Sequence, residues 1–349
     1  MFGQMPRKAP KRALIASVVT VLMVTLGGCD LFGNKKEPAG AVKSAAAPPP
    51  PTPAVTEAEA KKIISRYAAV MNLAGKRLNI RTAARAETGS ALELRKAQYK
   101  IFKTNKLSTY DYKFTTALGA TPKFSGYPRW FLIAPTDRGT GKRTRTLVIF
   151  VQDKAGGPWL AAYTPQAARA TGPLGKGIDV PDVAEVVRPD DASLVLAPGR
   201  LPAAHADMLA KGKRSTSTRL FQLNSMVTQR YQNVRESRKI FTDRGWKGYY
   251  TPAASTHPIY SVRTTSGGAL VWYAVDFKTA GRNPGDATGL VWKTGNWGDL
   301  HKPFVGASKV RSWFNGLERQ ELVAYIPPKG KGKIQIIAGS WSPVTLRGK

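Results

Sequence analysis

The chain of 349 residues contains few of the residues on which most enzyme chemistry depends. It has one cysteine and three histidines, and its 22 acidic residues stand against 54 lysines and arginines. A single cysteine cannot form a disulfide bridge within the chain, and it excludes zinc sites that need several thiolates. No disulfide framework and no cysteine-based metal centre are therefore expected.

The three histidines are His205, His257 and His301, and they lie far apart in the sequence. None has a second metal-ligating residue three or four positions away, which is the spacing that places two ligands on one helix face. The sequence therefore predicts no bound metal and no cofactor. It favours surface or turn positions for all three histidines.

Catalytic motifs are incomplete wherever they appear. Lys293-Thr294-Gly295 matches one triplet of penicillin-recognising enzymes, but the Ser-x-x-Lys motif of those enzymes is absent. Residues 139–144 and 172–177 are rich in glycine and lysine, yet both lack the first glycine of a phosphate-binding loop. Asp190 and Asp191 are adjacent, so on a loop they point apart instead of flanking a glycosidic bond. We predict that the chain is not an enzyme; an enzyme with an unrecognised site is the alternative.

Positive charge and apolar residues are what the chain has in quantity. Its formal net charge is +32, and hydrophobic residues make up 42% of it. This apolar content excludes disorder of the whole chain, and the length accommodates two domains of about 150 residues each.

The first 29 residues combine a basic segment, an apolar segment and the single cysteine. Residues 1–12 contain four basic residues and no acidic one, and residues 13–26 are uncharged and mostly apolar. This layout is typical of a secretory signal peptide, because so short an apolar segment does not span a bilayer. An N-terminal membrane anchor or a buried helix is the alternative.

Leu26-Gly27-Gly28-Cys29 resembles the lipobox of bacterial lipoproteins. The resemblance implies that residues 1–28 are removed as a signal peptide and that Cys29 receives a diacylglyceryl group. Two acyl chains suffice for stable anchoring, whereas one chain binds a membrane only marginally. We therefore expect a lipoprotein that is attached to the outer face of the cell membrane through Cys29.

Residues 29–55 hold the lipidated cysteine and then a flexible spacer. They have almost no large apolar residue after Phe32, and they include an alanine-rich run and the prolines 48–51 and 53. Such a segment cannot bury a core, and its proline block is stiff and extended. We expect a tether that separates the folded part from the membrane.

Helical patterns followed by strand patterns occur twice in the remaining chain. Thr56 with Glu59, and Ser90 with Glu93, form capping-box patterns that open helices. The strand patterns of the first half cover residues 130–133, 146–151 and 159–163. In the second half a helix is expected at residues 202–209, and strands at residues 259–262, 270–277, 321–326 and 334–341.

The sequence thus predicts an α+β fold of two tandem modules, at residues 56–170 and 201–349, joined by a connecting segment at residues 171–200. Lys100-Ile101-Phe102 and Lys239-Ile240-Phe241 echo each other at the ends of the two helical parts. Helices packed on one face of a curved antiparallel sheet are a common α+β arrangement.

This layout resembles the NTF2-like (cystatin-like) cone, and the chain resembles uncharacterised actinobacterial lipoproteins built from two such halves. The resemblance implies a cavity between the helices and the sheet of a module. Aromatic residues on the expected strands are candidates to line it, with ordinary core positions as the alternative: Trp130, Trp159, Tyr163, Trp272 and Tyr273.

Lysine and arginine are spread along both halves and gather in four segments, Lys142–Arg145, Lys211–Arg214, Arg235–Lys239 and Lys329–Lys333. On a membrane-anchored exported chain, these segments predict a non-enzymatic binding or scaffolding role toward an anionic envelope polymer or a partner protein. Generic solubility charge explains the same residues equally well. The alternative function is a carrier of a small apolar ligand in a module cavity. Nucleic acid is not an expected partner, because an exported chain seldom meets it.

Overall fold

Regular structure begins at the capping box that the sequence predicts. In the computed structural model, Glu59 N–H donates to Thr56 Oγ1 at 3.3 Å, and Thr56 N–H donates to the Glu59 carboxylate at 2.7 Å. These bonds open helix α1 (Glu57–Arg77). The structure describes residues 49–109, 111–137, 144–168, 178–285, 287–291, 297–307 and 309–349.

Helices α2 (Ile80–Ala83) and α3 (Gly89–Thr104) complete the first helical layer. The second capping box is not formed, so that prediction is wrong. Helix α3 begins two residues earlier than the pattern indicates, with Thr88 as its N-cap, and Ser90 is buried inside its first turn. Glu93 is then free to bind a partner outside its own helix, as described below.

The first half contains an antiparallel sheet with the strand order β7-β6-β4-β5-β8, in which β2 also pairs with β4. Its central strands confirm the predicted ones. The bounds are β2 (Phe114–Ala120), β4 (Arg129–Asp137), β5 (Thr144–Thr146), β6 (Val148–Gln152), β7 (Leu160–Tyr163) and β8 (Gln166–Ala168), and a separate pair is formed by β1 (Thr52–Pro53) and β3 (Lys123–Phe124).

The second half opens with α4 (Leu201–Lys211), three short 3-10 turns (Pro198–Arg200, Gly212–Arg214, Thr216–Leu220) and α5 (Ser225–Asp243). A curled antiparallel sheet follows, with the order β10-β11-β14-β15 and β9 paired to β11. Its strands are β9 (Lys247–Ala254), β10 (Tyr260–Arg263), β11 (Ala269–Arg282), β14 (Trp313–Ile326) and β15 (Gln335–Gly348). The short pair β12 (Leu290–Val291) and β13 (Lys309–Val310) and helix α6 (Trp297–Val305) lie between β11 and β14 in the chain.

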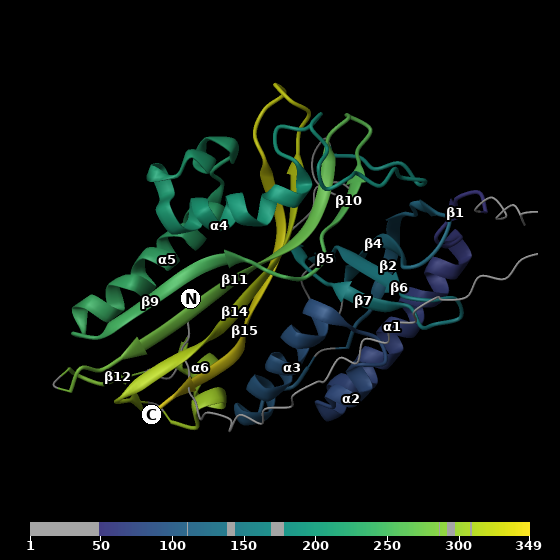
Figure 1. The fold of residues 1–349 in the computed structure, drawn as a ribbon. Helices are drawn as coiled ribbons and strands as arrows, with labels where there is room; N and C mark the ends of the chain where they lie inside the picture. The colour runs from purple at the N-terminus through teal and green to yellow at the C-terminus, as the bar shows by residue number, and fades with distance from the viewer. Residues whose placement is uncertain are drawn as a thin grey trace, which may run out of the picture. The chain divides into compact units, whose positions relative to one another are not determined.

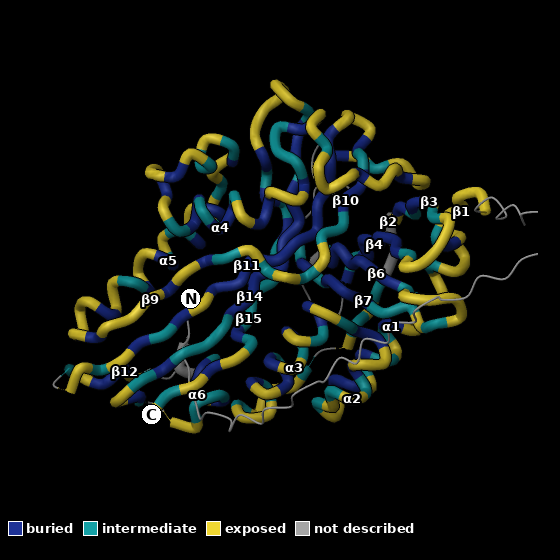
Figure 2. Tube along the Cα trace, in the orientation of Figure 1, coloured by how far each residue is buried: buried dark blue, intermediate teal, exposed yellow. Residues whose placement is uncertain are grey.

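Four layers result, because each sheet is covered on both faces (Figure 1, Figure 2). Helices α1 and α3 pack on one face of the first sheet, in a cluster that includes Tyr67, Phe131 and Phe150. Helices α4 and α5 pack on one face of the second sheet. The two remaining faces pack against each other in a cluster with members from both halves, including Trp130 and Trp272. The α+β prediction is confirmed, and residues 50–349 belong to one compact unit.

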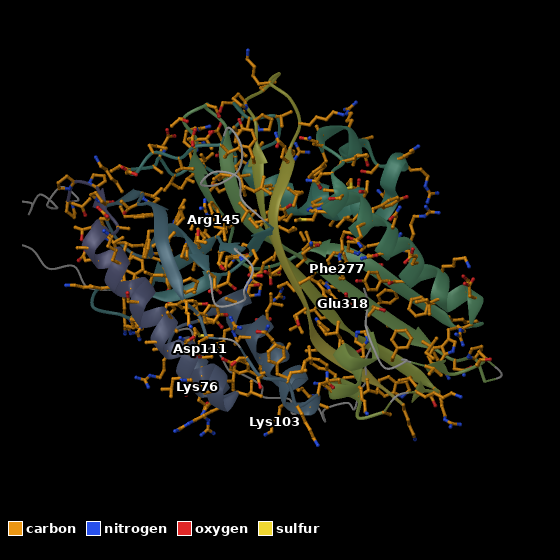
Figure 3. The ribbon with its side chains drawn as sticks, turned by 180° about the vertical axis from the view of Figure 1, so that it is seen from behind. Lys76, Lys103, Asp111, Arg145, Phe277 and Glu318 are labelled. Atoms are coloured by element: carbon orange, nitrogen blue, oxygen red, sulfur yellow. The ribbon has the colours of Figure 1, made fainter. Side chains whose placement is uncertain are left out.

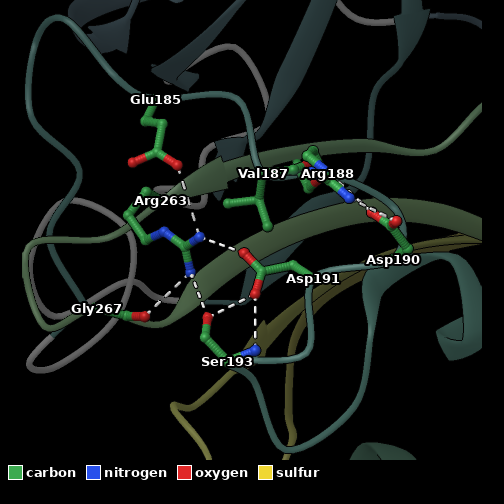
Figure 4. Close-up of polar contacts among 9 residues, drawn as sticks. Glu185, Val187, Arg188, Asp190, Asp191, Ser193, Arg263 and Gly267 are labelled. Carbon is green, nitrogen blue, oxygen red and sulfur yellow. Dashed lines mark hydrogen bonds and ion pairs between the residues drawn. The ribbon is translucent and has the colours of Figure 1, made fainter.

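Residues 178–200 of the connecting segment are held against the second sheet by Arg263 (Figure 4). The Arg263 guanidinium pairs with Asp191 and also donates to Ser193 Oγ at 3.4 Å. Hydrogen bonds from Ser193 and Arg263 lower the pKa of Asp191 to about 2. Asp190 instead pairs with Arg188 at 2.7 Å. The two adjacent carboxylates therefore have different partners and do not form one catalytic pair.

Several predictions from the sequence fall outside the described residues. They include the signal peptide, Cys29 and most of the tether, the glycine- and lysine-rich segments 139–143 and 172–177, and Lys293-Thr294-Gly295. Within the part of the chain that the structure describes, no helix is long and apolar enough to cross a membrane.

The contact between the two sheets depends on Trp272, whose indole N–H donates to the Leu147 carbonyl at 3.0 Å. Trp272→Phe removes this donor, leaves a buried carbonyl without its partner and opens a small cavity. We expect the substitution to lower the free energy of unfolding by about 2–4 kcal/mol, measured by urea denaturation of residues 50–349.

Trp159→Phe is the matched control, because Trp159 is only partly buried at the edge of the helix-covered cluster. Trp159→Phe should lower the free energy of unfolding by less than half as much as Trp272→Phe. Equal losses from the two substitutions would contradict the role assigned to the Trp272 hydrogen bond.

Candidate functional site

The five aromatic residues that the sequence singled out do not meet in one cavity. Trp130, Tyr163 and Trp272 are buried between the two sheets, whereas Tyr273 is buried on the opposite face of β11, beneath α4. Trp272 and Tyr273 diverge because consecutive residues of a strand point to opposite faces. Trp159 packs at the edge of the first helical layer.

Two of the three histidines are buried, so their predicted surface positions are wrong. His205 lies beneath α4, with Nδ1 2.7 Å from the Tyr273 hydroxyl, and burial lowers its pKa to about 3. His301 on α6 is fully buried. His257 does lie in a loop, between β9 and β10, with Nε2 3.6 Å from Glu93. The described residues contain no group of three or more histidine, cysteine or acidic side chains placed to hold a metal ion.

A buried ionic network connects α3 to the second sheet. The Arg319 guanidinium on β14 donates to Asp276 on β11 at 2.6 Å and to Glu93 on α3 at 2.6 Å. Arg319 and Asp276 are both buried. Glu93 was predicted to cap its own helix, and instead it binds a residue more than two hundred positions away. The network joins the halves and presents no unpaired nucleophile.

Glu318 lies on the opposite face of β14, toward α5 (Figure 3). Its Oε2 accepts from the Tyr250 hydroxyl at 2.6 Å and from the Trp341 indole at 3.1 Å. The Arg230 guanidinium lies 3.6 Å from the same carboxylate oxygen and 3.7 Å from the centre of the Phe277 ring. Glu318 and Glu321 therefore project from opposite faces of the strand and do not form an acid–base pair.

Glu321 is a buried carboxylate at the junction of the two halves. Its Oε2 accepts a hydrogen bond from the Thr164 backbone N–H at 2.9 Å. Burial raises its pKa from 4.5 to about 7, and the negative charge of Glu87 acts in the same direction. Glu321 is consequently the one described carboxyl group for which a pKa near neutral pH is resolved, a feature that the pattern of its strand did not indicate.

The structure brings two of the four basic segments together. The 3-10 turn that follows α4 carries Lys213 and Arg214, and α5 carries Arg235 and Arg238 beside it. We call these four residues the α4–α5 basic corner. The first two residues of Lys142–Arg145 lie outside the described residues, and Lys329–Lys333 forms the turn between β14 and β15.

Arg238 fixes the geometry of the α4–α5 basic corner. Its guanidinium donates to the Tyr250 carbonyl on β9 at 2.8 Å and to the Ala210 carbonyl on α4 at 2.5 Å. Burial lowers the pKa of Arg238, and the charge of Arg214 lowers it further. The positive charge of Arg214 therefore acts on Arg238 within the corner.

Gly212 allows the 3-10 turn Gly212–Arg214 to lie directly against Tyr231 of α5. Its φ is +58°, and a Cβ at this position would meet the Tyr231 ring at 2.2 Å. No larger residue fits there without moving one element away from the other. The Arg235 guanidinium lies over the same ring, 5.9 Å from its centre. Neighbouring lysines are neutralised differently, because Lys211 pairs with Asp207 and Lys239 with Asp243 within their own helices.

Burial also changes the charge balance of the surface. Among the buried polar residues of the described chain, five are carboxylates and two are arginines. The buried carboxylates are Glu87, Asp137, Asp276, Glu318 and Glu321. The solvent-exposed surface is therefore more positive than the overall composition indicates.

The raised pKa of Glu321 makes stability depend on pH. The folded chain holds a proton on Glu321 up to about pH 7, whereas the unfolded chain releases it near pH 4.5. Stability therefore falls as pH rises through this window. Between pH 5 and pH 8, the unfolding free energy of wild-type residues 50–349 should fall by about 2–3 kcal/mol more than that of Glu321→Gln.

Urea denaturation at a series of pH values measures this difference. The glutamine still accepts from the Thr164 N–H, and Glu236→Gln at an exposed position of α5 is the matched control for the loss of one carboxylate. Parallel stability curves for wild type and Glu321→Gln would show that Glu321 does not titrate in this range.

The chain matches one family model and two lipoproteins of Streptomyces. Residues 51–340 match the family model of a domain of unknown function, DUF8094. An uncharacterised lipoprotein of Streptomyces coelicolor is 28% identical over 280 residues, which cover 77% of each chain. An uncharacterised lipoprotein of Streptomyces avermitilis is 28% identical over 274 residues, covering 76% of this chain and 75% of its own. No solved structure matches the chain. Since the family model covers well over half of the sequence, the chain belongs to the DUF8094 family.

Proposed function

We propose that this chain is a non-enzymatic lipoprotein of the cell envelope that binds an anionic envelope polymer through the α4–α5 basic corner. In this proposal residues 1–28 are a signal peptide, and diacylglyceryl-modified Cys29 anchors the chain at the outer face of the membrane. The names of the two Streptomyces relatives support the lipoprotein assignment. The tether, expected over residues 29–55, ends before Thr52 in this proposal, because Thr52 and Pro53 pair with β3 and Val55 is buried in the first-half core.

The observation that carries the binding role is the clustering of like charges at the corner. Lys213, Arg214 and Arg235 are exposed, and no ion pair to any of them is found among the described residues. Bringing such groups together costs electrostatic free energy that a polyanion recovers. Ile334, which follows the basic turn Lys329–Lys333, bridges to Phe221, which follows the last 3-10 turn.

The two-module organisation also remains a proposal. Each half runs from helices to an antiparallel sheet, and the echoing triplets at residues 100–102 and 239–241 lie near the ends of α3 and α5. This repetition supports two NTF2-like (cystatin-like) modules at residues 56–170 and 201–349. The five strand aromatics do not share one space, which gives no support to a carrier of an apolar ligand built on them.

Charge reversal at the corner tests the binding role. The triple variant Lys213→Glu, Arg214→Glu, Arg235→Glu should bind a poly(glycerol phosphate) chain about 100-fold more weakly, since each basic contact contributes roughly 1 kcal/mol. Titration at several salt concentrations should also give a shallower salt dependence for the variant than for wild type.

The matched control reverses three exposed basic residues elsewhere, Arg81→Glu, Lys96→Glu and Lys103→Glu, on α2 and α3. It changes the net charge by the same amount, so it should lose much less affinity. Equal losses from the two triple variants would show that the charge acts only generically. Binding that salt does not weaken would contradict an electrostatic contact.

Lipidation is tested by the mass of the N-terminal peptide from the membrane fraction. We expect a peptide that begins at Cys29 and carries a diacylglyceryl group, and no such peptide from Cys29→Ala. An unmodified peptide that begins at Met1 would overturn both the anchor and the envelope location.

A further inference from the structure

We propose that a pocket between α3 and β15 binds an uncharged, hydroxylated ligand of about the size of one sugar ring. We call it the α3–β15 pocket. The pocket shares no residue with the α4–α5 basic corner. This inference therefore goes beyond the proposed function and is tested independently of it.

The α3–β15 pocket has a volume of about 350 Å³, which is within the range of small-molecule sites. Helix α3 runs beside β15, the edge strand of the second sheet (Figure 1), and residues of both elements line the pocket together with Gln166 of β8. Besides Tyr67 and Tyr112, its polar lining residues come from α3, β5, β8 and β15 or their flanking loops: Arg95 and Gln98, Thr146, Thr164 and Gln166, Ser340 and Ser342.

The charge of the pocket wall is already balanced. Arg95 is the one charged residue among the described lining residues. Its guanidinium donates to both oxygens of buried Glu87, at 3.1 and 2.9 Å, and to the Tyr112 hydroxyl at 2.9 Å. The Tyr67 hydroxyl also donates to Glu87, at 2.9 Å. A charged ligand would lose its hydration here without gaining an opposite charge, so the wall favours a neutral one.

Hydrogen-bonding groups remain available on the sheet side of the pocket. Thr146 is buried, and its Oγ1 has no hydrogen-bond partner among the described residues. A buried hydroxyl without a partner costs about 1–3 kcal/mol, which a bound hydroxyl group would offset. Gln166 is directly opposite Thr146 in the β5–β8 ladder, so both side chains project from the same face. Both residues line the pocket, where the Gln166 side chain is partly exposed, and a small shift of the wall would bring a ligand hydroxyl to the buried Thr146 Oγ1.

The helix side of the pocket is apolar, with Leu94, Ile101 and Phe102 from α3. A sugar ring matches such a wall, because it has C–H groups on its faces and hydroxyl groups around its rim. An entirely apolar ligand would cover Thr146 and Gln166 without satisfying them. The pocket therefore fits a polyhydroxylated ring better than a hydrocarbon.

Saturation-transfer NMR and thermal shifts on the full chain in detergent test this inference. The probes are glucose and N-acetylglucosamine as neutral rings, glucuronate and glucosamine as charged analogues, and toluene as an apolar ligand. We expect saturation transfer to at least one neutral sugar and weaker binding of its charged analogue and of toluene. No transfer to either neutral sugar, or stronger binding of a charged or apolar probe, would overturn the proposal.

The variant Thr146→Val, Gln166→Leu removes the two sheet-side hydrogen-bonding groups at nearly constant volume. It should weaken sugar binding about tenfold or more, while Thr251→Val at an exposed site of β9 should leave it unchanged. Thr146→Val alone should not lower the melting temperature of the unliganded protein, because the hydroxyl that it removes has no partner. A lower melting temperature, or sugar binding equal to wild type in the double variant, would contradict the site.

Discussion

The burial of both faces of both sheets is the constraint on which the rest of this structure depends. In β11, Trp272 faces the first sheet and Tyr273 faces α4, and in β4, Trp130 and Phe131 divide in the same way. Antiparallel sheets often leave one face to water, but these strands are apolar on both. Each sheet therefore needs a helical layer on one side and the other sheet on its second side.

Polar groups trapped by this packing have to satisfy one another. Arg319 serves Asp276 and Glu93, Arg230 lies beside Glu318, and Arg95 binds Glu87. Such buried pairs add little net stability, but removing one partner strongly lowers the stability of the fold, because the other charge is left buried and unpaired. The pairs of Arg319 and Glu318 therefore penalise any register of β14 that separates the partners. The same arrangement removes carboxylates from the surface and leaves the basic residues outside.

The sequence was informative where a pattern is local. The Thr56 capping box and the central apolar strands have periodic signals, and the structure contains them. The sequence did not predict strand β9, because its glycine and proline weaken the strand pattern. Pro252 is tolerated there since β9 pairs with one neighbour only. Ser90 and His205 were placed wrongly because their burial depends on partners distant in sequence. The divergence of Trp272 and Tyr273 follows from the period of a strand and was overlooked.

In the proposed function, the α4–α5 basic corner differs from charge that serves only solubility, because the local backbone geometry holds its residues together. Charge that serves solubility gains from dispersal, and helical pairs such as Lys239 with Asp243 show how the chain neutralises it. At the corner, by contrast, Gly212 lets the 3-10 turn approach Tyr231, and partly buried Arg238 ties α4 to β9 close to Arg214. Both devices hold like charges together against their repulsion. In the proposed function, a bound polyanion would offset this repulsion.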